Sequence, residues 1–226
     1  MLNGPVGGAR AAHGRYSVKM FEPAAAADAP SEVVFLILGS LQFFEACFRV
    51  YGHPELLAVA AGVNGDDLVP FNVALWIEAP GLGASVAWHQ DGWALWDSPG
   101  LDVSSHGFNF MAPLCGCTPA NGLWVVPGCH RLGKVDIKAW VEAAGTELPP
   151  EAVPLVCGPG DVGLTKRQAA HGSFANTNPD WRVTVNQDLH RRRSVLGVMG
   201  GGMHNAPGGL RRRADRRAGE GDRLSA

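Results

Sequence analysis

The chain lacks any long apolar run and any secretion signal. Its longest apolar run, residues 33–38, is far too short to cross a bilayer. The N-terminus shows no basic segment followed by an apolar stretch and a cleavage site. We therefore expect a cytoplasmic protein that does not contact a membrane.

Cysteine spacing excludes a disulfide framework. The five cysteines are odd in number and include no CxxC pair; they lie at positions 47, 115, 117, 129 and 157. Such usage favours reduced thiols. A soft-metal site at Cys115 and Cys117 is an alternative, but alternation along a strand explains this pair more simply.

Glycine and proline are abundant, and they favour short strands and turns over a helical bundle. The 226 residues include 30 glycines and 16 prolines, about a fifth of the chain. This length fits one domain with a substantial core. We find no internal repeat.

Charge is distributed unevenly along the chain. Residues 191–226 hold nine arginines against three acidic residues, although the whole chain has a net charge of −2. A basic arm of this kind could bind nucleic acid. The segment contains no aromatic residue on which a base could stack, so we do not favour this interpretation.

Composition divides the chain into three parts. Residues 1–30 are rich in Gly, Ala and Pro, and we expect a loosely ordered segment. Residues 31–198 carry the periodic apolar patterns of a folded domain. Residues 199–226 form a Gly/Arg-rich tail with little apolar content, which predicts disorder.

Three helices are expected. Residues 40–51 have apolar side chains at helical spacing, and a second helix starts at Pro54, with Gly62 as its expected stop. A third helix over Asp136–Ala144 has an N-cap aspartate and ends before Gly145.

The remaining elements are strands. Residues 71–78 and 181–189 alternate apolar and polar side chains. Further short strands are expected at 108–114, 122–126, 153–157 and 162–165. Helices followed by many short strands indicate a mainly β, α+β chain with a double-sheet core.

His89 and Asp91 are the first candidate metal ligands. Side chains at positions i and i+2 of a strand point the same way, so the two would reach toward one point. An imidazole and a carboxylate are two thirds of the facial triad of non-haem Fe(II) oxygenases. His-x-Asp also occurs by chance, so the pair needs a third ligand.

His171 is the candidate third ligand. It follows a Pro159–Asp161 turn and a short apolar strand, and small residues flank it. Eleven residues later Arg182 begins a strand with a polar face. An inward guanidinium there is suited to pair with the carboxylate of a co-substrate. The alternative is a core histidine and a surface arginine.

Four stretches together resemble the phytanoyl-CoA dioxygenase family: WHQDGW (88–93), TPANGLWVVPGCHRLGKVD (118–136), PGD (159–161) and HGSFANTNPDWRV (171–183). The resemblance covers about residues 65–198. It implies a double-stranded β-helix core of the jelly-roll, cupin-like kind, with N-terminal helices packed outside. It also implies Fe(II), 2-oxoglutarate as co-substrate, and dioxygen.

The resemblance also implies residue roles. His89, Asp91 and His171 match the iron ligands, while Arg182 and Ser173 match positions that hold the distal carboxylate of 2-oxoglutarate. Four further positions are assigned more loosely by their place beside these motifs. Asn72 is expected in the co-substrate pocket, and the candidate substrate contacts are Gln90, Trp93 and Asn109.

Two features of the sequence bear on the pocket. Met111 stands where many family members have tryptophan, which alters the co-substrate and substrate contacts expected from its strand. The loop over residues 93–106 directly follows the ligand pair and is the expected substrate-facing lid.

The implied reaction is hydroxylation of a small organic substrate with release of succinate and CO2. Related halogenases replace the ligand carboxylate with a small residue, whereas this chain keeps Asp91. Two alternatives remain open: a metal-binding barrel whose catalysis is impaired by incomplete termini, and a nucleic-acid-binding protein with a basic tail. The sequence leaves the oligomeric state open.

Overall fold

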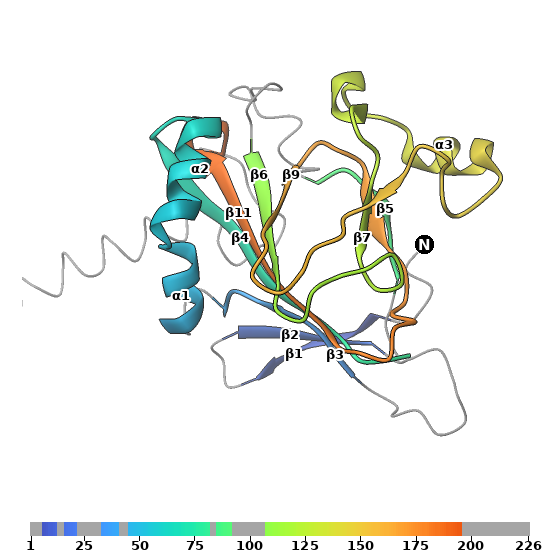
Figure 1. Cartoon of the computed structure of the whole chain (residues 1–226), viewed down its shortest axis with the longest axis horizontal. Helices are drawn as coiled ribbons and strands as arrows, with labels where there is room; N and C mark the ends of the chain where they lie inside the picture. Colours follow the sequence, from blue (N-terminus) through green and yellow to red (C-terminus); the bar gives the residue numbers. More distant parts are fainter. Residues whose placement is uncertain are drawn as a thin grey trace, which may run out of the picture.

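The fold consists of two antiparallel sheets that face each other, with helices outside them (Figure 1). The computed structural model describes residues 6–12, 16–21, 33–40, 45–81, 85–91 and 107–195. The larger sheet, in spatial order, contains β1 (Val6–Ala12), β2 (Tyr16–Phe21), β3 (Val33–Leu38), β4 (Leu68–Glu78), β11 (Arg182–Arg191), β6 (Gly107–Pro113) and β9 (Gly163–Lys166). The smaller sheet contains β5 (Val86–His89), β10 (His171–Ser173), β7 (Leu123–Val125) and β8 (Val153–Pro154). The predicted mainly β chain with a double-sheet core is confirmed.

The helices lie on the outside of this pair of sheets, as the sequence predicted. They are α1 (Glu45–Tyr51), α2 (Pro54–Asn64), α3 (Ile137–Ala144) and the short α4 (Arg192–Val195), with a 3-10 turn η3 (Cys129–Leu132). In Figure 1, α1 and α2 run beside β4 and β11, whereas α3 lies beyond the smaller sheet. No helix in these described ranges is long and apolar enough to cross a membrane.

A compact apolar cluster joins the first two helices to the larger sheet. Buried Tyr51 and Ala60 pack with Val73, Phe110 and Leu189. The Tyr51 hydroxyl also donates a 2.7 Å hydrogen bond to the backbone carbonyl of Asp188. Because that carbonyl belongs to β11, the helices are attached to the strand that runs between β4 and β6.

Helix boundaries agree with the sequence in part. The third helix has the predicted caps, with Asp136 accepting a 3.0 Å hydrogen bond from the Ala139 amide. The predicted end of the second helix at Gly62 is wrong, because α2 continues to Asn64. Glycine is tolerated inside a helix at a modest cost, and the helix instead ends at Gly65, whose φ of 83° suits glycine. The expected helix over 40–51 begins in the structure at Glu45, and residues 41–44 lie outside the described part.

The N-terminal segment differs from the sequence expectation. Residues 1–30 were expected to be loosely ordered, yet β1 pairs with β2 and β2 pairs with β3 at the edge of the larger sheet. Strand pairing satisfies the hydrogen bonds of backbone groups without requiring an apolar period in the sequence. The side-chain pattern of residues 1–30 therefore did not predict these strands. The division of the chain at residues 30 and 198 stays a prediction, and the tail over 199–226 lies outside the described residues.

A buried ion pair ties the strand before the third candidate ligand to β11. Arg167, just after β9, pairs with Asp188 on β11, and each is only 1% exposed. Asn186 donates a 3.1 Å hydrogen bond to the same carboxylate. Burial, the largest influence, raises the pKa of Asp188 to about 7, and the charge of Arg167 limits that rise. The pair therefore holds the turn over residues 167–170 against the larger sheet.

Removing the buried cation should destabilise the fold strongly. We expect Arg167→Met to lower the free energy of unfolding by about 3–5 kcal/mol, because Asp188 is left buried and unpaired. The double variant Arg167→Met/Asp188→Asn should recover part of that loss. Urea unfolding followed by circular dichroism measures both.

The exposed ion pair Arg192–Asp67 provides the control. Its atoms approach to 2.6 Å, yet both side chains are more than half exposed. Arg192→Met should therefore cost less than about 1 kcal/mol. Equal losses in the Arg167 and Arg192 variants would contradict a structural role for the buried pair.

Candidate metal centre

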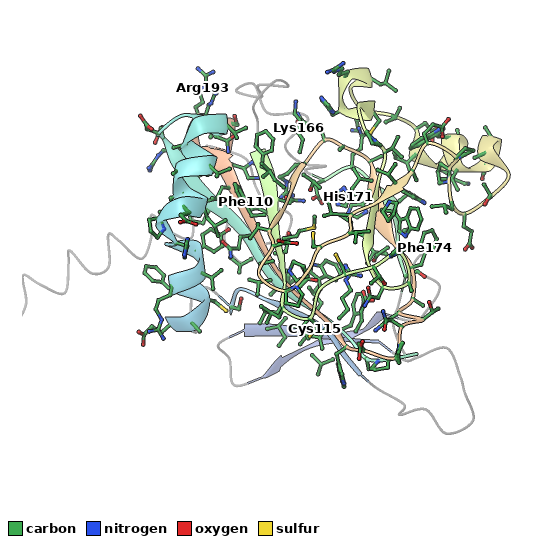
Figure 2. All side chains as sticks on the ribbon, viewed as in Figure 1. Phe110, Cys115, Lys166, His171, Phe174 and Arg193 are labelled. Carbon is green, nitrogen blue, oxygen red and sulfur yellow. The ribbon has the colours of Figure 1, made fainter. Side chains whose placement is uncertain are left out.

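Three candidate ligands converge where β5 pairs with β10. His89 and His171 are directly opposite each other in this antiparallel pair, and Asp91 follows two residues after His89. The two imidazole centroids are 4.2 Å apart. The Asp91 carboxylate lies 3.5 Å from Nε2 of His89 and 3.4 Å from Nε2 of His171. One donor atom from each residue lies within 4.8 Å of the others. Figure 2 shows His171 in the interior of the molecule.

Backbone carbonyls orient both imidazoles. Nδ1 of His89 lies 2.8 Å from the carbonyl oxygen of Ala87, and Nδ1 of His171 lies 2.9 Å from that of Ala169. Since a carbonyl only accepts, each Nδ1 must carry its proton and donate. When the ring is neutral, Nε2 is then the nitrogen with the free lone pair, and both Nε2 atoms lie beside Asp91. This is the tautomer that a metal-binding histidine needs.

The Asp91 carboxylate is held in its ionised form by two neighbours. Asn109 on β6 donates a 2.6 Å hydrogen bond to Oδ2, and the Arg167 guanidinium lies 3.7 Å from Oδ1. Burial alone would raise the pKa of Asp91, but the charge of Arg167, the largest opposing influence, holds it well below its usual value, with smaller contributions from His171 and His89. A charged carboxylate is therefore available as a ligand.

The two histidines differ in their electrostatic surroundings. Burial and the neighbouring His89 lower the pKa of His171 to about 4, so its imidazole is neutral at physiological pH. Burial, the largest single influence, acts to lower the pKa of His89, but the hydrogen bond to Asp91, the charge of Asp91 and the Ala87 carbonyl together outweigh it, so the net change is upward. Two imidazole nitrogens and one carboxylate suit a first-row divalent metal such as Fe(II).

Close approach of β10 to β5 depends on Gly172. A Cβ atom at this position would lie 3.0 Å from the backbone oxygen of Val86 and 3.2 Å from the backbone nitrogen of Trp88. These atoms belong to the neighbouring strand, so a side chain at Gly172 would push the strands apart. The spacing of the two histidines rests on this close contact.

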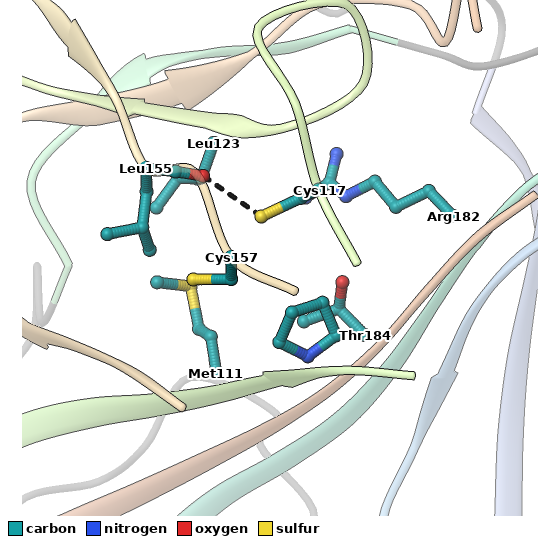
Figure 3. Close-up of a pocket in the computed structure, with 8 residues that line it drawn as sticks. Met111, Cys117, Leu123, Leu155, Cys157, Arg182 and Thr184 are labelled. Carbon is teal, nitrogen blue, oxygen red and sulfur yellow. Dashed lines mark hydrogen bonds between the residues drawn. The ribbon is translucent and has the colours of Figure 1, made fainter. Parts of the chain in front are cut away.

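Arg182 lies at a small cavity between the sheets, at the start of β11 (Figure 3). The cavity is lined mainly by apolar and sulfur-bearing side chains: Met111, Pro113, Cys117, Leu123, Leu155, Cys157, Arg182 and Thr184. Met111, the departure from the family pattern, therefore borders the same cavity as Arg182. Figure 3 also shows Cys117 donating to the backbone oxygen of Leu155, at 2.9 Å.

The guanidinium of Arg182 already has an internal partner. Its Nη1 donates a 2.8 Å hydrogen bond to Oε1 of Glu78, and both residues are buried. Glu78 was not predicted to be a site residue, although strand alternation over 71–78 indicates that it shares the polar face with Asn72. Arg167 was also missed, and no motif marks it.

Of the other residues expected at the co-substrate or substrate site, the structure describes some and not others. Ser173 is buried on β10, two residues after His171, so both side chains leave the same face of the strand. Asn72 belongs to β4, but its side chain lies outside the described set. Trp93 and the expected lid over residues 93–106 also lie outside the described residues.

Two residues expected to contact substrate are occupied by other contacts. The Gln90 amide donates to the carbonyls of Gly133 and Gln168, at 2.9 and 2.8 Å, and accepts from the Val135 amide at 2.9 Å. Gln90 thus holds the loop after η3 in place. Asn109 is bonded to Asp91, so its amide group supports a candidate ligand.

Solved structures similar to this chain include EvdMO1, AviO1 and EctD. EvdMO1 shares 27% identity over 74% of this chain and 38% of its own, with a TM-score of 0.60. AviO1 from Streptomyces viridochromogenes Tue57 shares 26% identity over 74% of this chain and 71% of its own, with a TM-score of 0.57. EctD from S. alaskensis, solved with 2-oxoglutarate and 5-hydroxyectoine, shares 23% identity over 74% of this chain and 61% of its own, with a TM-score of 0.58.

These likenesses confirm the double-stranded β-helix fold. The chain spans less than two thirds of the EvdMO1 and EctD chains. A comparison with curated proteins gave no match. Residues 44–184, more than half of the sequence, match the phytanoyl-CoA dioxygenase (PhyH) profile, and the chain therefore belongs to the phytanoyl-CoA dioxygenase family.

Proposed function

We propose that this chain is an Fe(II)- and 2-oxoglutarate-dependent dioxygenase that hydroxylates a small organic substrate and releases succinate and CO2. The observation that carries the proposal is the convergence of two imidazoles, each with Nδ1 held by a main-chain carbonyl, and one carboxylate, whose donor atoms lie within 4.8 Å. Membership of the PhyH family supports the same chemistry. EctD is described with bound Fe and with 2-oxoglutarate, which is consistent with it.

His89, Asp91 and His171 would hold the iron. Bound Fe(II) supplies dioxygen activation coupled to oxidative decarboxylation of 2-oxoglutarate. The chain itself contributes two imidazoles fixed by the main chain, of which that of His171 is neutral, and a carboxylate kept ionised mainly by Arg167. Retention of the carboxylate at Asp91 favours hydroxylation over halogenation, which needs an open position for halide.

Arg182 and Ser173 would bind the distal carboxylate of 2-oxoglutarate. A guanidinium is suited to this because it can donate two parallel hydrogen bonds to one carboxylate. Arg182 borders a cavity and is buried, so the interaction would be shielded from water. Asn72 would line the same pocket, from the neighbouring strand β4.

Metal and co-substrate binding can be tested by absorbance. Adding Fe(II) and 2-oxoglutarate to the protein under anaerobic conditions should produce a visible charge-transfer band. Asp91→Ala should abolish the band, because it removes the anionic ligand. Asp180→Ala, at an exposed position in the segment before β11, is the control and should retain it. No band with the native protein, or an unchanged band in Asp91→Ala, would contradict the proposed centre.

The assignment of Arg182 can be tested by co-substrate affinity. Arg182→Gln should weaken 2-oxoglutarate binding by about 100-fold, because one partner of a buried charge-assisted contact is lost. Since this variant leaves the Glu78 carboxylate buried and unpaired, the double variant Arg182→Gln/Glu78→Gln should be measured beside it. Equal affinity in the native protein and the double variant would exclude Arg182 from the site. Succinate release with candidate substrates then distinguishes an enzyme from an impaired metal-binding protein.

A further inference from the structure

Glu78 and Arg182 form a buried pair at the proposed co-substrate pocket. They are directly opposite each other in the β4–β11 ladder, so their side chains leave the same face of the sheet. Nη1 of Arg182 lies 2.8 Å from Oε1 of Glu78. The exposed fractions of the two residues are 1% for Glu78 and 5% for Arg182. The arginine expected to receive the co-substrate thus already neutralises an internal carboxylate.

The Glu78 carboxylate is incompletely satisfied. Within the described residues, its Oε2 is buried and has no hydrogen-bond partner. The nearby Asn176 amide donates to the backbone carbonyl of Glu78, at 3.3 Å, and to two other main-chain carbonyls, but to neither carboxylate oxygen of Glu78. An ionised oxygen buried without a partner is costly, and protonation removes that cost.

Among the residues that the structure describes, few charged groups face this carboxylate. From β11 the charged neighbour is Arg182. From the segment after β10, Asn176 is neutral, and Asp180 is exposed and offers its backbone carbonyl to Asn176. From β3 the packing around Trp76, two residues before Glu78, is apolar. Within this described part of the chain, the Arg182 guanidinium is therefore the main source of positive charge available to Glu78.

Co-substrate binding would place a second carboxylate on the same guanidinium. Two carboxylates that share one buried positive charge cannot both remain ionised at low cost, and one of them takes up a proton. We propose that Glu78 is the group that becomes protonated when 2-oxoglutarate binds Arg182, so that co-substrate binding and proton uptake are coupled. This inference rests on the proposed function.

The direction of the Glu78 pKa agrees with this assignment. Burial, the largest influence, raises its pKa to about 7, and the attraction of Arg182 limits the rise. A second carboxylate beside Arg182 would raise the pKa further. Above pH 7, Glu78 would thus be ionised in the free protein and protonated in the complex. Below pH 6 it would be protonated in both, and no proton would be taken up.

The sign of the pH dependence follows from this difference. Because the complex binds more protons than the free protein, 2-oxoglutarate affinity falls as pH rises. A group with a pKa near 7 weakens binding by about tenfold between pH 6 and pH 8. Uptake at pH 8 should approach about one proton per 2-oxoglutarate bound.

Calorimetry measures this uptake directly. The full chain is loaded with Mn(II), so that turnover does not start, and titrated with 2-oxoglutarate at pH 6 and pH 8. Each titration is repeated in two buffers that differ in ionisation enthalpy, and the difference in heat gives the number of protons taken up. The native protein should show uptake at pH 8 and almost none at pH 6.

Glu78→Gln is the decisive variant. It keeps the size of the side chain and a hydrogen-bond acceptor for Arg182 but cannot titrate, so both the uptake and the tenfold pH dependence should disappear. The control is Glu142→Gln on α3, where an exposed glutamate lies 3.7 Å from Lys138. That variant should behave as the native protein.

Two results would count against the inference, and they differ from each other. If the native protein binds 2-oxoglutarate at pH 8 without proton uptake, the role of Glu78 is wrong while the proposed function stands. If 2-oxoglutarate does not bind at either pH, the proposed co-substrate fails, and the inference fails with it. The first result needs only the native protein, so it does not depend on the folding of any variant.

Discussion

Pairing of β5 with β10 is the interaction on which the candidate site depends. Its register sets His89 opposite His171, and the small size of Gly172 lets the backbones approach closely enough for the imidazoles to stand 4.2 Å apart. The larger sheet adds the groups that hold Asp91. Asn109 comes from β6, and Arg167, which follows β9, is held by β11 through Asp188. The centre is thus built where the two sheets meet.

Local features of this site were predictable from the sequence. The alternation of side chains along a strand predicted that His89 and Asp91 would reach toward one point, and the turn and small residues around His171 indicated a candidate third ligand. The caps of α3 were read correctly for the same reason, because Asp136 and Gly145 act within a few residues. Signals of this kind depend on neighbours in the sequence.

Contacts between distant segments were not predictable in the same way. Glu78 and Arg182 are 104 residues apart, and Arg167 and Asp188 belong to different elements. The residues next to a buried charged side chain do not predict its partner, because the register of two strands determines which side chains meet. The pairing of β1 with β2 and the contacts of Gln90 with the loop after η3 escaped prediction for this reason.

The anchoring of the three candidate ligands gives them unequal tolerance to mutation. The carbonyls that orient His89 and His171 belong to the main chain of Ala87 and Ala169, so replacing either alanine cannot delete the acceptor. Asp91 instead depends on the side chains of other residues, which a single base change can remove. Mutations that accumulate in such a protein would therefore first remove the contacts that position the Asp91 carboxylate, while the two imidazoles would keep their orientation.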